Sequence, residues 1–383
     1  MTLLTTTSEL NQACARFETS RYVTIDTEFL REKTFWPQLC LVQIAMPDFE
    51  VLIDPLAENI DLSALFEILK NQNIIKVMHG CRQDIEIFHK EAGIIPTPLM
   101  DTQVMAMVCG YGDSISYEAL VKRIPQGTID KGSRFTDWSR RPLNDDQLTY
   151  ALADVTYLRD IFENLENELA TTGRLEWLSE EMDILTNPET YNQSPEIAWK
   201  RLKFQDKRPH IMGVIIELAK WREIQAQTRD VPRNRILKDD AIREIALQNP
   251  KKPEDFDRMR SVPRGFIASR NAEGLMAAVE AGRQLTKSEL PPPPAVVDNR
   301  PGIGPLVDLL KVLLKFCCEE NQVAPKLIAN VADLERIASD ENPQVKCMEG
   351  WRKEVFGGAA MDLKNGKLAL ASEDDKIVII RRD

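Results

Sequence analysis

The chain has no stretch of about eighteen consecutive apolar residues, the length that a membrane-spanning helix requires. Its first residues, MTLLTTTSEL, lack the basic region and the long apolar stretch of a secretory signal peptide. The seven cysteines form no C-x-x-C pair, and their odd number argues against a disulfide framework. These absences predict a cytoplasmic protein without a membrane partner, whose cysteines are reduced core residues.

The net charge of −11 gives little sign of a nucleic-acid partner, but this total hides an asymmetry. Residues 1–190 carry a net charge of −15, residues 191–290 carry +6, and residues 291–383 carry −2. A basic module is the usual electrostatic footprint of a phosphate-binding protein, although a helical domain with many solvated Lys and Arg residues explains it equally well. At 383 residues, two or three domains are expected.

The first part of the chain alternates strand-like and helix-like patterns, which predicts an α/β sheet with helices on its faces. Strands are expected at 21–29, 39–46, 51–56 and 74–80, with a hairpin between the second and third, and a helix at 62–71. From about residue 140 onward the patterns are almost entirely helical.

The first strand places two carboxylates on one face, because Asp26 and Glu28 are two positions apart in YVTIDTEF. Two ionised acids repel each other unless a cation neutralises them, so the pair is a candidate Mg²⁺ or Mn²⁺ site. A solvated polar face beside a loop explains a bare D-x-E better, since a metal site needs more ligands than two.

A third carboxylate, Asp84, follows the strand that ends at Gly80 and falls in the first turn of the next helix. Stabilisation of the helix N-terminus explains this position as well as metal ligation does. The nearby His79, Cys81 and His89 match no common zinc spacing, which argues against zinc.

The fourth carboxylate belongs to the clearest helix of the sequence, with Asn144 as N-cap, Gln147 completing a capping box and Gly173 just past its end. Tyr150 and Asp154 are four residues apart, so they lie on one face of this helix. Alone, this pair is unremarkable. The ordered series of four acids and a tyrosine carries the argument for a site.

Short helical patterns bounded by prolines predict a compact helical bundle over 207–288. A proline-rich linker over 289–305 separates it from a second helical bundle over 306–383, which closes with a possible hairpin.

This series of residues resembles the DEDD exonuclease superfamily, in the branch whose last motif carries a tyrosine. The segments that resemble the ribonuclease D family more closely are TIDTEF, WPQLCLVQIA, HGCRQDIEIF, MDTQVMA, DWSRRPL and LTYALADVTYL. WREIQAQTRDVPRNRILKDDAIREIA resembles the HRDC domain, and the second bundle fits a doubled HRDC arrangement by position and pattern alone. The resemblance implies a ribonuclease H-like mixed α/β sheet with flanking helices over 1–190, followed by two small all-α HRDC-like bundles.

The same resemblance implies a site with two divalent metal ions, Mg²⁺ or Mn²⁺, held by the four carboxylates. Asp26 would bridge both ions, Glu28 and Asp154 would hold the ion that activates water, and Asp84 would help to hold the other. Tyr150 would orient or deprotonate that water.

Further contacts to the substrate are expected from Thr27, Phe29 and Leu30 beside the strand acids, and from His79 and Gln83. For Phe29 and Leu30, plain core packing is an equally good interpretation.

Two other segments carry residues of interest. Asp101 is expected to be a helix N-cap rather than a ligand. The segment DKGSRFTDWSRRPL contains Arg134, Trp138, Arg140 and Arg141, which suit either phosphate contact or anchoring of the loop.

We therefore expect a monomeric 3′–5′ exoribonuclease that releases 5′-mononucleotides and trims structured RNA with a short 3′ tail, tRNA precursors above all. A DNA-trimming exonuclease is the nearest alternative, because no residue visibly reads the 2′-hydroxyl. An inactive nucleic-acid-binding scaffold is the alternative from another class.

Overall fold

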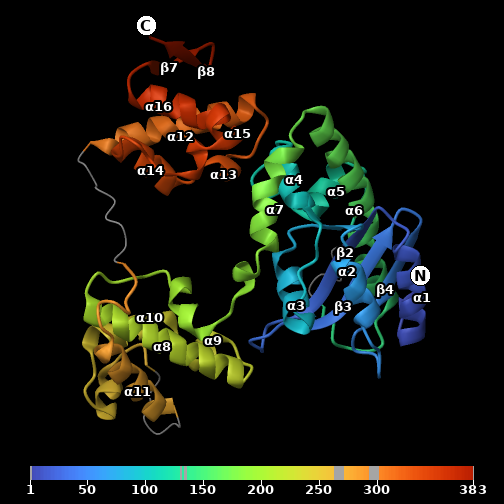
Figure 1. The fold of residues 1–383 in the computed structure, drawn as a ribbon, viewed down its shortest axis with the longest axis horizontal. Coiled ribbons are helices and arrows are strands. Elements are labelled where there is room, and N and C mark those ends of the chain that lie inside the picture. Colours follow the sequence, from blue (N-terminus) through green and yellow to red (C-terminus); the bar gives the residue numbers. More distant parts are fainter. Residues whose placement is uncertain (1, 130–131, 133–135, 263–270, 293–301, 383) are drawn as a thin grey trace. The chain divides into compact units, whose positions relative to one another are not determined.

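The structure is a computed structural model, and it describes residues 2–129, 132, 136–262, 271–292 and 302–382. Arg134 and most of the predicted proline-rich linker lie outside these residues. The contacts within the chain divide it into two compact units, whose helices and strands are labelled in Figure 1. The sheet unit comprises Met1–Glu28, Leu39–Thr190 and Val297–Asp383, and the helical unit comprises Phe29–Gln38 and Tyr191–Val296.

The sheet unit is built on a six-stranded mixed sheet of order β1-β4-β3-β2-β5-β6. Its strands are β1 (Leu3–Leu4), β2 (Tyr22–Leu30), β3 (Gln38–Met46), β4 (Phe49–Ile53), β5 (Ile75–Met78) and β6 (Leu99–Asp101). The four predicted strands and the hairpin between β3 and β4 are confirmed. The two short strands β1 and β6 were not predicted, because two or three residues give no measurable alternation.

The strand register determines where the acidic strand ends. β2 and β5 are parallel, and Thr24 pairs with Val77. Asp26 and Glu28 therefore lie beyond the end of this pairing, at the carboxyl edge of the sheet. The helix α3 (Arg82–Ala92) begins at the same edge, just after β5, and carries Asp84 in its first turn. Ligands of α/β proteins bind at such an edge.

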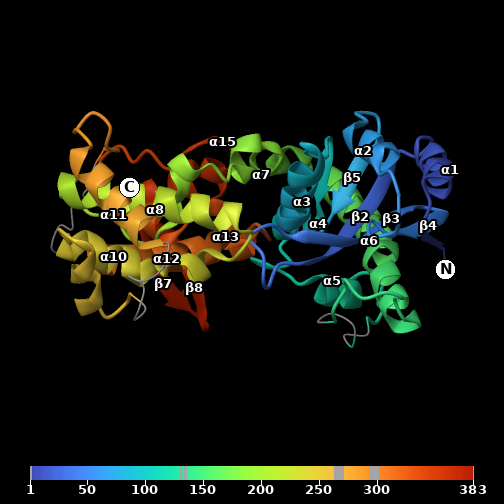
Figure 2. The same ribbon diagram turned by 90° about the horizontal axis from the view of Figure 1, so that it is seen from below.

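Helices cover the sheet on both sides. They are α1 (Thr7–Phe17), α2 (Ser63–Lys70), α3, α4 (Thr102–Val108), α5 (Tyr117–Arg123), α6 (Asp145–Thr171) and α7 (Ser179–Thr186). Figure 2 shows α1 and α2 on one side of the strands and α5 with α6 on the other. The predicted N-cap at Asn144, its capping box with Gln147, and the left-handed Gly173 after the helix are confirmed for α6.

Two hydrogen bonds align α6 with the acidic strand β2. The Thr24 hydroxyl donates to the Val155 carbonyl at 2.8 Å, and further back on β2 the Tyr22 hydroxyl donates to Glu163 at 2.6 Å. Because later helix residues meet earlier strand residues, α6 runs antiparallel to β2. This direction brings the N-terminal half of α6 to the carboxyl edge of the sheet, where Asp26 lies.

The C-terminal helices cluster with the sheet unit. This region contains α12 (Ile303–Glu320), α13 (Pro325–Ile328), α14 (Val331–Ser339), α15 (Gly350–Arg352), α16 (Gly358–Lys364) and the hairpin of β7 (Leu368–Glu373) and β8 (Lys376–Arg381). The Trp351 ring stacks on Trp177 at 4.1 Å between centroids. Arg352, 1% exposed, forms ion pairs with Glu180 at 2.7 Å and Glu181 at 3.0 Å. These contacts seat the region on the segment that follows α6.

The helical unit contains α8 (Pro209–Thr228), α9 (Arg233–Ile236), α10 (Asp239–Gln248) and α11 (Asn271–Gln284). Between α10 and α11, within the bundle predicted over 207–288, Pro253–Arg258 forms a short 3-10 helix. The unit also takes in the segment after the acidic strand: Phe35 is 2% exposed in its core, and the Phe35 and Trp36 amides donate to Asp230 at 3.0 Å.

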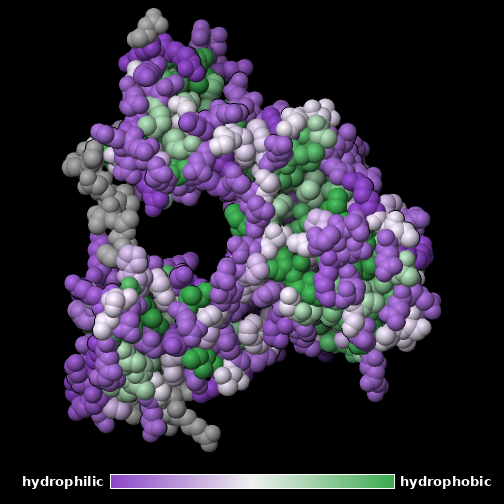
Figure 3. Space-filling view, viewed as in Figure 1, coloured by the Kyte–Doolittle hydropathy of each residue, from purple (hydrophilic) through white to green (hydrophobic). Residues whose placement is uncertain are grey.

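The face of the molecule shown in Figure 3 is mostly hydrophilic, with smaller hydrophobic patches between the hydrophilic residues. All seven cysteines are buried and unpaired with one another, which fits the predicted reduced core residues. In the described part of the chain, every helix is too short or too polar to cross a bilayer.

Candidate active site

Three of the predicted acids meet at the carboxyl edge of the sheet. Asp26 and Glu28 come from β2 and Asp154 from α6, and one oxygen of each lies within 4.8 Å of the others. Among the described residues, these three form the group whose geometry could hold a metal ion, and His79, Cys81 and His89 form no such group. Asp26 and Glu28 lie on the same face of β2 because side chains alternate along a strand. Asp154 reaches them because α6 runs antiparallel to β2.

The electrostatics of Asp26 reflect this crowding. Burial raises the pKa of its carboxyl well above the usual range, and the neighbouring Asp84, Asp154 and Glu28 raise it further. A cation between these groups would favour the ionised form and reverse the shift. The donor set consists of hard carboxylate oxygens, which suits Mg²⁺ or Mn²⁺.

Asp84 lies beside this group and has a hydrogen-bond partner of its own. It is 7% exposed, and the hydroxyl of the buried Thr27 donates to its Oδ1. Burial raises the pKa of the Asp84 carboxyl to about 7, although the bond from Thr27 acts in the opposite direction. The hydroxyl of Thr27 therefore fixes the position of the Asp84 carboxylate.

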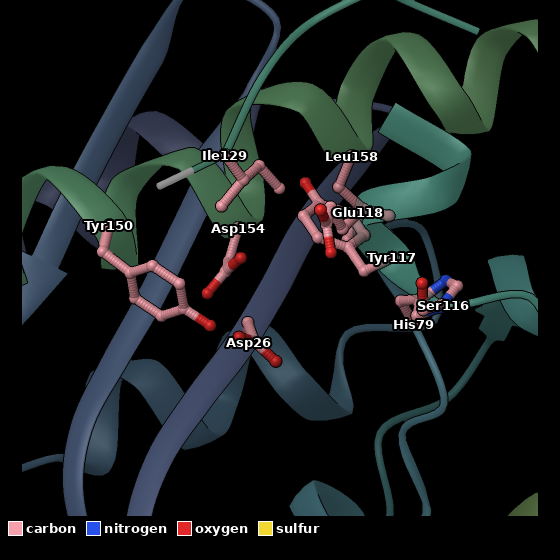
Figure 4. A pocket seen from close by; sticks show the side chains of 9 residues that line it. All are labelled: Asp26, His79, Ser116, Tyr117, Glu118, Ile129, Tyr150, Asp154 and Leu158. Atoms are coloured by element: carbon pink, nitrogen blue, oxygen red, sulfur yellow. The ribbon is translucent and has the colours of Figure 1, made fainter. Parts of the chain in front are cut away.

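Tyr150 completes the arrangement. A pocket of about 200 Å³ is lined by Asp26, Asp154 and Tyr150 together with residues of α5. In Figure 4 the hydroxyl of Tyr150 points toward Asp26 and Asp154. The one-turn spacing of Tyr150 and Asp154 gives both side chains access to the same pocket.

The residues predicted to contact substrate do not all lie at this pocket. His79 lines the pocket, its Nδ1 lies 2.9 Å from the Thr102 hydroxyl, and burial lowers the pKa of its imidazole. Phe29 and Leu30 are half-buried at the end of β2, and Gln83 is exposed on α3. Of the residues predicted to contact substrate, only His79 is among those that line this pocket.

The sequence reasoning missed one wall of the pocket, formed by Ser116, Tyr117 and Glu118 at the start of α5 and by Ile129. The Tyr117 hydroxyl donates to the carbonyl of Ala153 at 3.0 Å, next to the acid of α6. Burial raises the pKa of the Tyr117 phenol well above its usual value, and the charges of Asp154 and Asp26 add to the effect. Glu118 is the one acid among these four residues, and a single acid is no signature of a site. Ser116, an N-cap residue before a helical pattern, was the available signal.

Asp101 is the predicted N-cap, since it accepts a hydrogen bond from the Gln103 amide at 2.8 Å. It also accepts from the amides of Gly80 and Cys81 at 2.9 and 3.0 Å. Gly80 has a φ of 63°, a conformation that favours glycine, and this turn directs both amides at Asp101. Asp101 thus secures the turn that leads into α3.

Comparison with known proteins identifies the fold and its chemistry. A family model described as 3′-5′ exonuclease matches residues 1–170, and an HRDC domain model matches residues 212–279. The ribonuclease D of Nitrobacter hamburgensis is 51% identical over 100% of both chains, and that of a Jannaschia species is 52% identical over 98% of both. The chain belongs to the ribonuclease D family.

Family membership makes the protein a 3′–5′ exonuclease of the exoribonuclease class. The crystal structure of Escherichia coli RNase D, described as an exoribonuclease involved in structured RNA processing, has a TM-score of 0.81. It is 28% identical, and the match covers 95% of this chain and 98% of that one. The predicted fold class, a mixed α/β exonuclease domain followed by small helical bundles, is confirmed, with an HRDC domain and a helical C-terminal region. That the second bundle is HRDC-like stays a prediction.

Proposed function

We propose that the protein removes nucleotides one at a time from RNA 3′ ends by a two-metal-ion mechanism and releases 5′-mononucleotides. The observation that carries this proposal is the convergence of Asp26, Glu28 and Asp154 within 4.8 Å in a pocket that Tyr150 also lines. Such a set of like charges favours binding of divalent cations. When bound, two such ions would stabilise the attacking and leaving oxygens of an in-line displacement at phosphorus and lower the pKa of water.

Each residue then has a distinct role. Asp26 would contact both ions, Glu28 and Asp154 would hold the one nearer the attacking water, and Asp84 would help to hold the other. Thr27 orients Asp84 through its hydroxyl. The supporting observation is that the charge of Asp84 raises the pKa of the Asp26 carboxyl, so the two side chains are neighbours.

Tyr150 would orient the attacking water through its phenolic oxygen, because its hydroxyl points into the acidic pocket (Figure 4). A free phenol has a pKa of about 10, so most of the proton transfer must depend on water of lowered pKa rather than on the tyrosine itself. His79, which lines the same pocket, would contact the terminal nucleotide.

The proposed substrates are structured RNAs with short 3′ tails, such as tRNA precursors, and the protein would act on them as a monomer. The net charge of +6 over residues 191–290 supports RNA binding by the helical unit. Several of its basic side chains are exposed, and they include Arg235, Lys238, Arg243, Lys251, Lys252, Arg258 and Arg260. Others are engaged in ion pairs, such as Arg233 with Glu223 at 2.6 Å.

The test is cleavage of a 5′-labelled tRNA precursor and of a DNA strand of the same sequence, with Mg²⁺, with Mn²⁺ and with a chelator. The expected result is a ladder that shortens from the 3′ end of the RNA and stops when the metal is removed. Equal cleavage of DNA would favour the DNA-trimming alternative. Cleavage that persists after complete chelation, in protein shown to be metal-free, would exclude the proposed mechanism.

A further inference from the structure

The segment that precedes α6 carries a buried tryptophan beside the proposed catalytic tyrosine. Trp138 is 2% exposed, and its ring lies 6.1 Å from that of Tyr150, with an angle of 36° between the planes. This separation is within the range of attractive aromatic pairs. Trp138 is not among the residues that line the pocket, so it contacts the site through Tyr150.

Arg141 fixes the backbone of this tryptophan. Its Nη1 donates to the Trp138 carbonyl at 2.8 Å, and its Nη2 donates to the Cys40 carbonyl of β3 at 2.7 Å. The same guanidinium binds both oxygens of Asp54, which follows β4, at 2.6 Å each. Asp54 is 4% exposed. Sequence reasoning left Arg141 between phosphate contact and loop anchoring, and these bonds place it in the second role.

The other end of the segment is tied to α6 itself. The side-chain amide of Gln147, in the first turn of α6, donates to the Thr136 hydroxyl at 3.0 Å. Between these two ties, Asp137 accepts hydrogen bonds from the amide and the hydroxyl of Ser139 at 3.1 and 2.6 Å. Trp138 is thus held from both sides, by the helix that carries Tyr150 and by the sheet that carries Asp26.

The indole of Trp138 is placed by packing rather than by a hydrogen bond to a described residue. Its Nε1 is buried and has no hydrogen-bond partner among the described residues. A buried N–H without an acceptor is unfavourable, and a purely apolar side chain of similar size would avoid this penalty. Among the described residues, the aromatic contact made by the indole ring is its packing against the ring of Tyr150.

We propose that Trp138, fixed to the sheet by the Asp54–Arg141 pair, is a positioning residue that holds the phenol of Tyr150 in the orientation required for cleavage. Tyr150 lies near the start of its helix, and without a wall its ring could adopt other rotamers. A misplacement of about 1 Å at a reacting group is enough to lower the rate markedly. This inference rests on the role proposed above for Tyr150.

The experiment measures kcat and KM on a short single-stranded oligonucleotide for Trp138→Leu and Trp138→Phe, each alone and combined with Tyr150→Phe. Trp138→Leu should lower kcat about tenfold with little change in KM, and Trp138→Phe, which keeps a ring against Tyr150, should stay within about twofold of the parent. In the Tyr150→Phe background, Trp138→Leu should cause no further loss of kcat. If Trp138→Leu does not fold, Trp138→Met replaces it in the same comparison.

Trp177→Leu is the matched control, because it also removes an aromatic stack, with Trp351, but away from the pocket. It should lower the melting temperature and leave kcat unchanged. The inference is overturned if Trp138→Leu leaves kcat unchanged, or if it lowers kcat equally with and without the Tyr150 hydroxyl. A different result, in which Tyr150→Phe alone has no effect on kcat, would instead overturn the role of Tyr150 in the proposed mechanism.

Discussion

Two aspartates of the sheet unit lie in opposite electrostatic settings. Asp54 meets a guanidinium that binds both of its oxygens. The charges that act most strongly on Asp26 are those of three other acids, Asp84, Asp154 and Glu28. The chain thus supplies Asp54, a buried acid with a structural role, with the positive charge of Arg141. The acids at the sheet edge repel one another, which is consistent with a site that is completed by cations from solution.

The sharpest test of this contrast exchanges each acid for its amide. Asp26→Asn should lower the exonuclease rate by about 10³-fold or more, since the proposed bridging ligand is lost. It should also raise the melting temperature of the metal-free protein, because one repelling charge is removed. Asp54→Asn should instead lower the free energy of unfolding by about 3 kcal/mol, because Arg141 loses its charged partner. Thermal unfolding and rate measurements on both variants check this, and loss of stability in Asp26→Asn would break the contrast.

Tyr150→Phe should have the next largest effect. Removing only the hydroxyl should lower kcat about a hundredfold, in the range of general acid–base and orienting groups, while RNA affinity and metal affinity stay close to those of the parent. The measurement combines single-turnover cleavage with binding of RNA in the absence of metal. An equal loss of binding would show that Tyr150 holds the substrate rather than the attacking water.

The pH dependence of the free energy of unfolding tests the crowding of the acids at the sheet edge without any substitution. The folded-state pKa of Asp84 is about 7, above the usual 3.8 for an aspartate, so unfolding releases a proton between these values. Stability conferred by this group is therefore complete below about pH 4 and is lost as the pH rises toward 7, by an amount on the order of a few kcal/mol.

Metal-free protein should accordingly have a lower melting temperature at pH 8 than at pH 5.5, and added Mg²⁺ should raise the melting temperature mainly at pH 8. The control is Asp84→Asn, in which the fall between these pH values should be smaller. A melting temperature that is the same at both pH values in metal-free protein would contradict the proposed crowding of acids.

The smallest effect is expected from substitutions of exposed Lys and Arg residues in the helical unit, which should change RNA affinity rather than kcat. Replacing Lys251 and Lys252 with Gln should weaken RNA binding and reduce the salt dependence of the affinity by about one to two charges, with kcat on short oligonucleotides unchanged. Replacing Arg208, which is paired with Asp206 at 2.8 Å, is the matched control and should have less effect. Point variants are preferable to deleting residues 207–383, because that deletion would uncover Trp177 and Glu180.

Much of the fold was readable from the sequence because the signals are local. Alternation in YVTIDTEF and the capping box at Asn144 each depend on neighbouring residues, and both elements appear where they were predicted. The packing of the C-terminal helices on the sheet unit was not predicted. It depends on Trp177 meeting Trp351 and on Arg352 meeting Glu180, and nothing in the sequence links residues so far apart.

The site shows the same division. Spacing within β2 and α6 put each predicted acid on one face of its element, and the structure brings Asp26, Glu28 and Asp154 together. The pocket wall at Ser116 and Tyr117 was not predicted, and the sequence left the role of Arg141 open between phosphate contact and loop anchoring, because the partners of Tyr117 and Arg141 are distant in sequence. Hydrogen bonds between residues far apart in the sequence leave no periodic pattern from which they could be predicted.

The most direct test of the central claim is calorimetric titration of Mn²⁺ into metal-free protein at pH 8, with Asp26→Asn and Asp54→Asn in parallel. The account predicts that the wild-type protein and folded Asp54→Asn bind Mn²⁺ with the same stoichiometry, and that Asp26→Asn loses most of this binding. Undiminished binding of Mn²⁺ by Asp26→Asn would show that the acids at the sheet edge do not form the metal site.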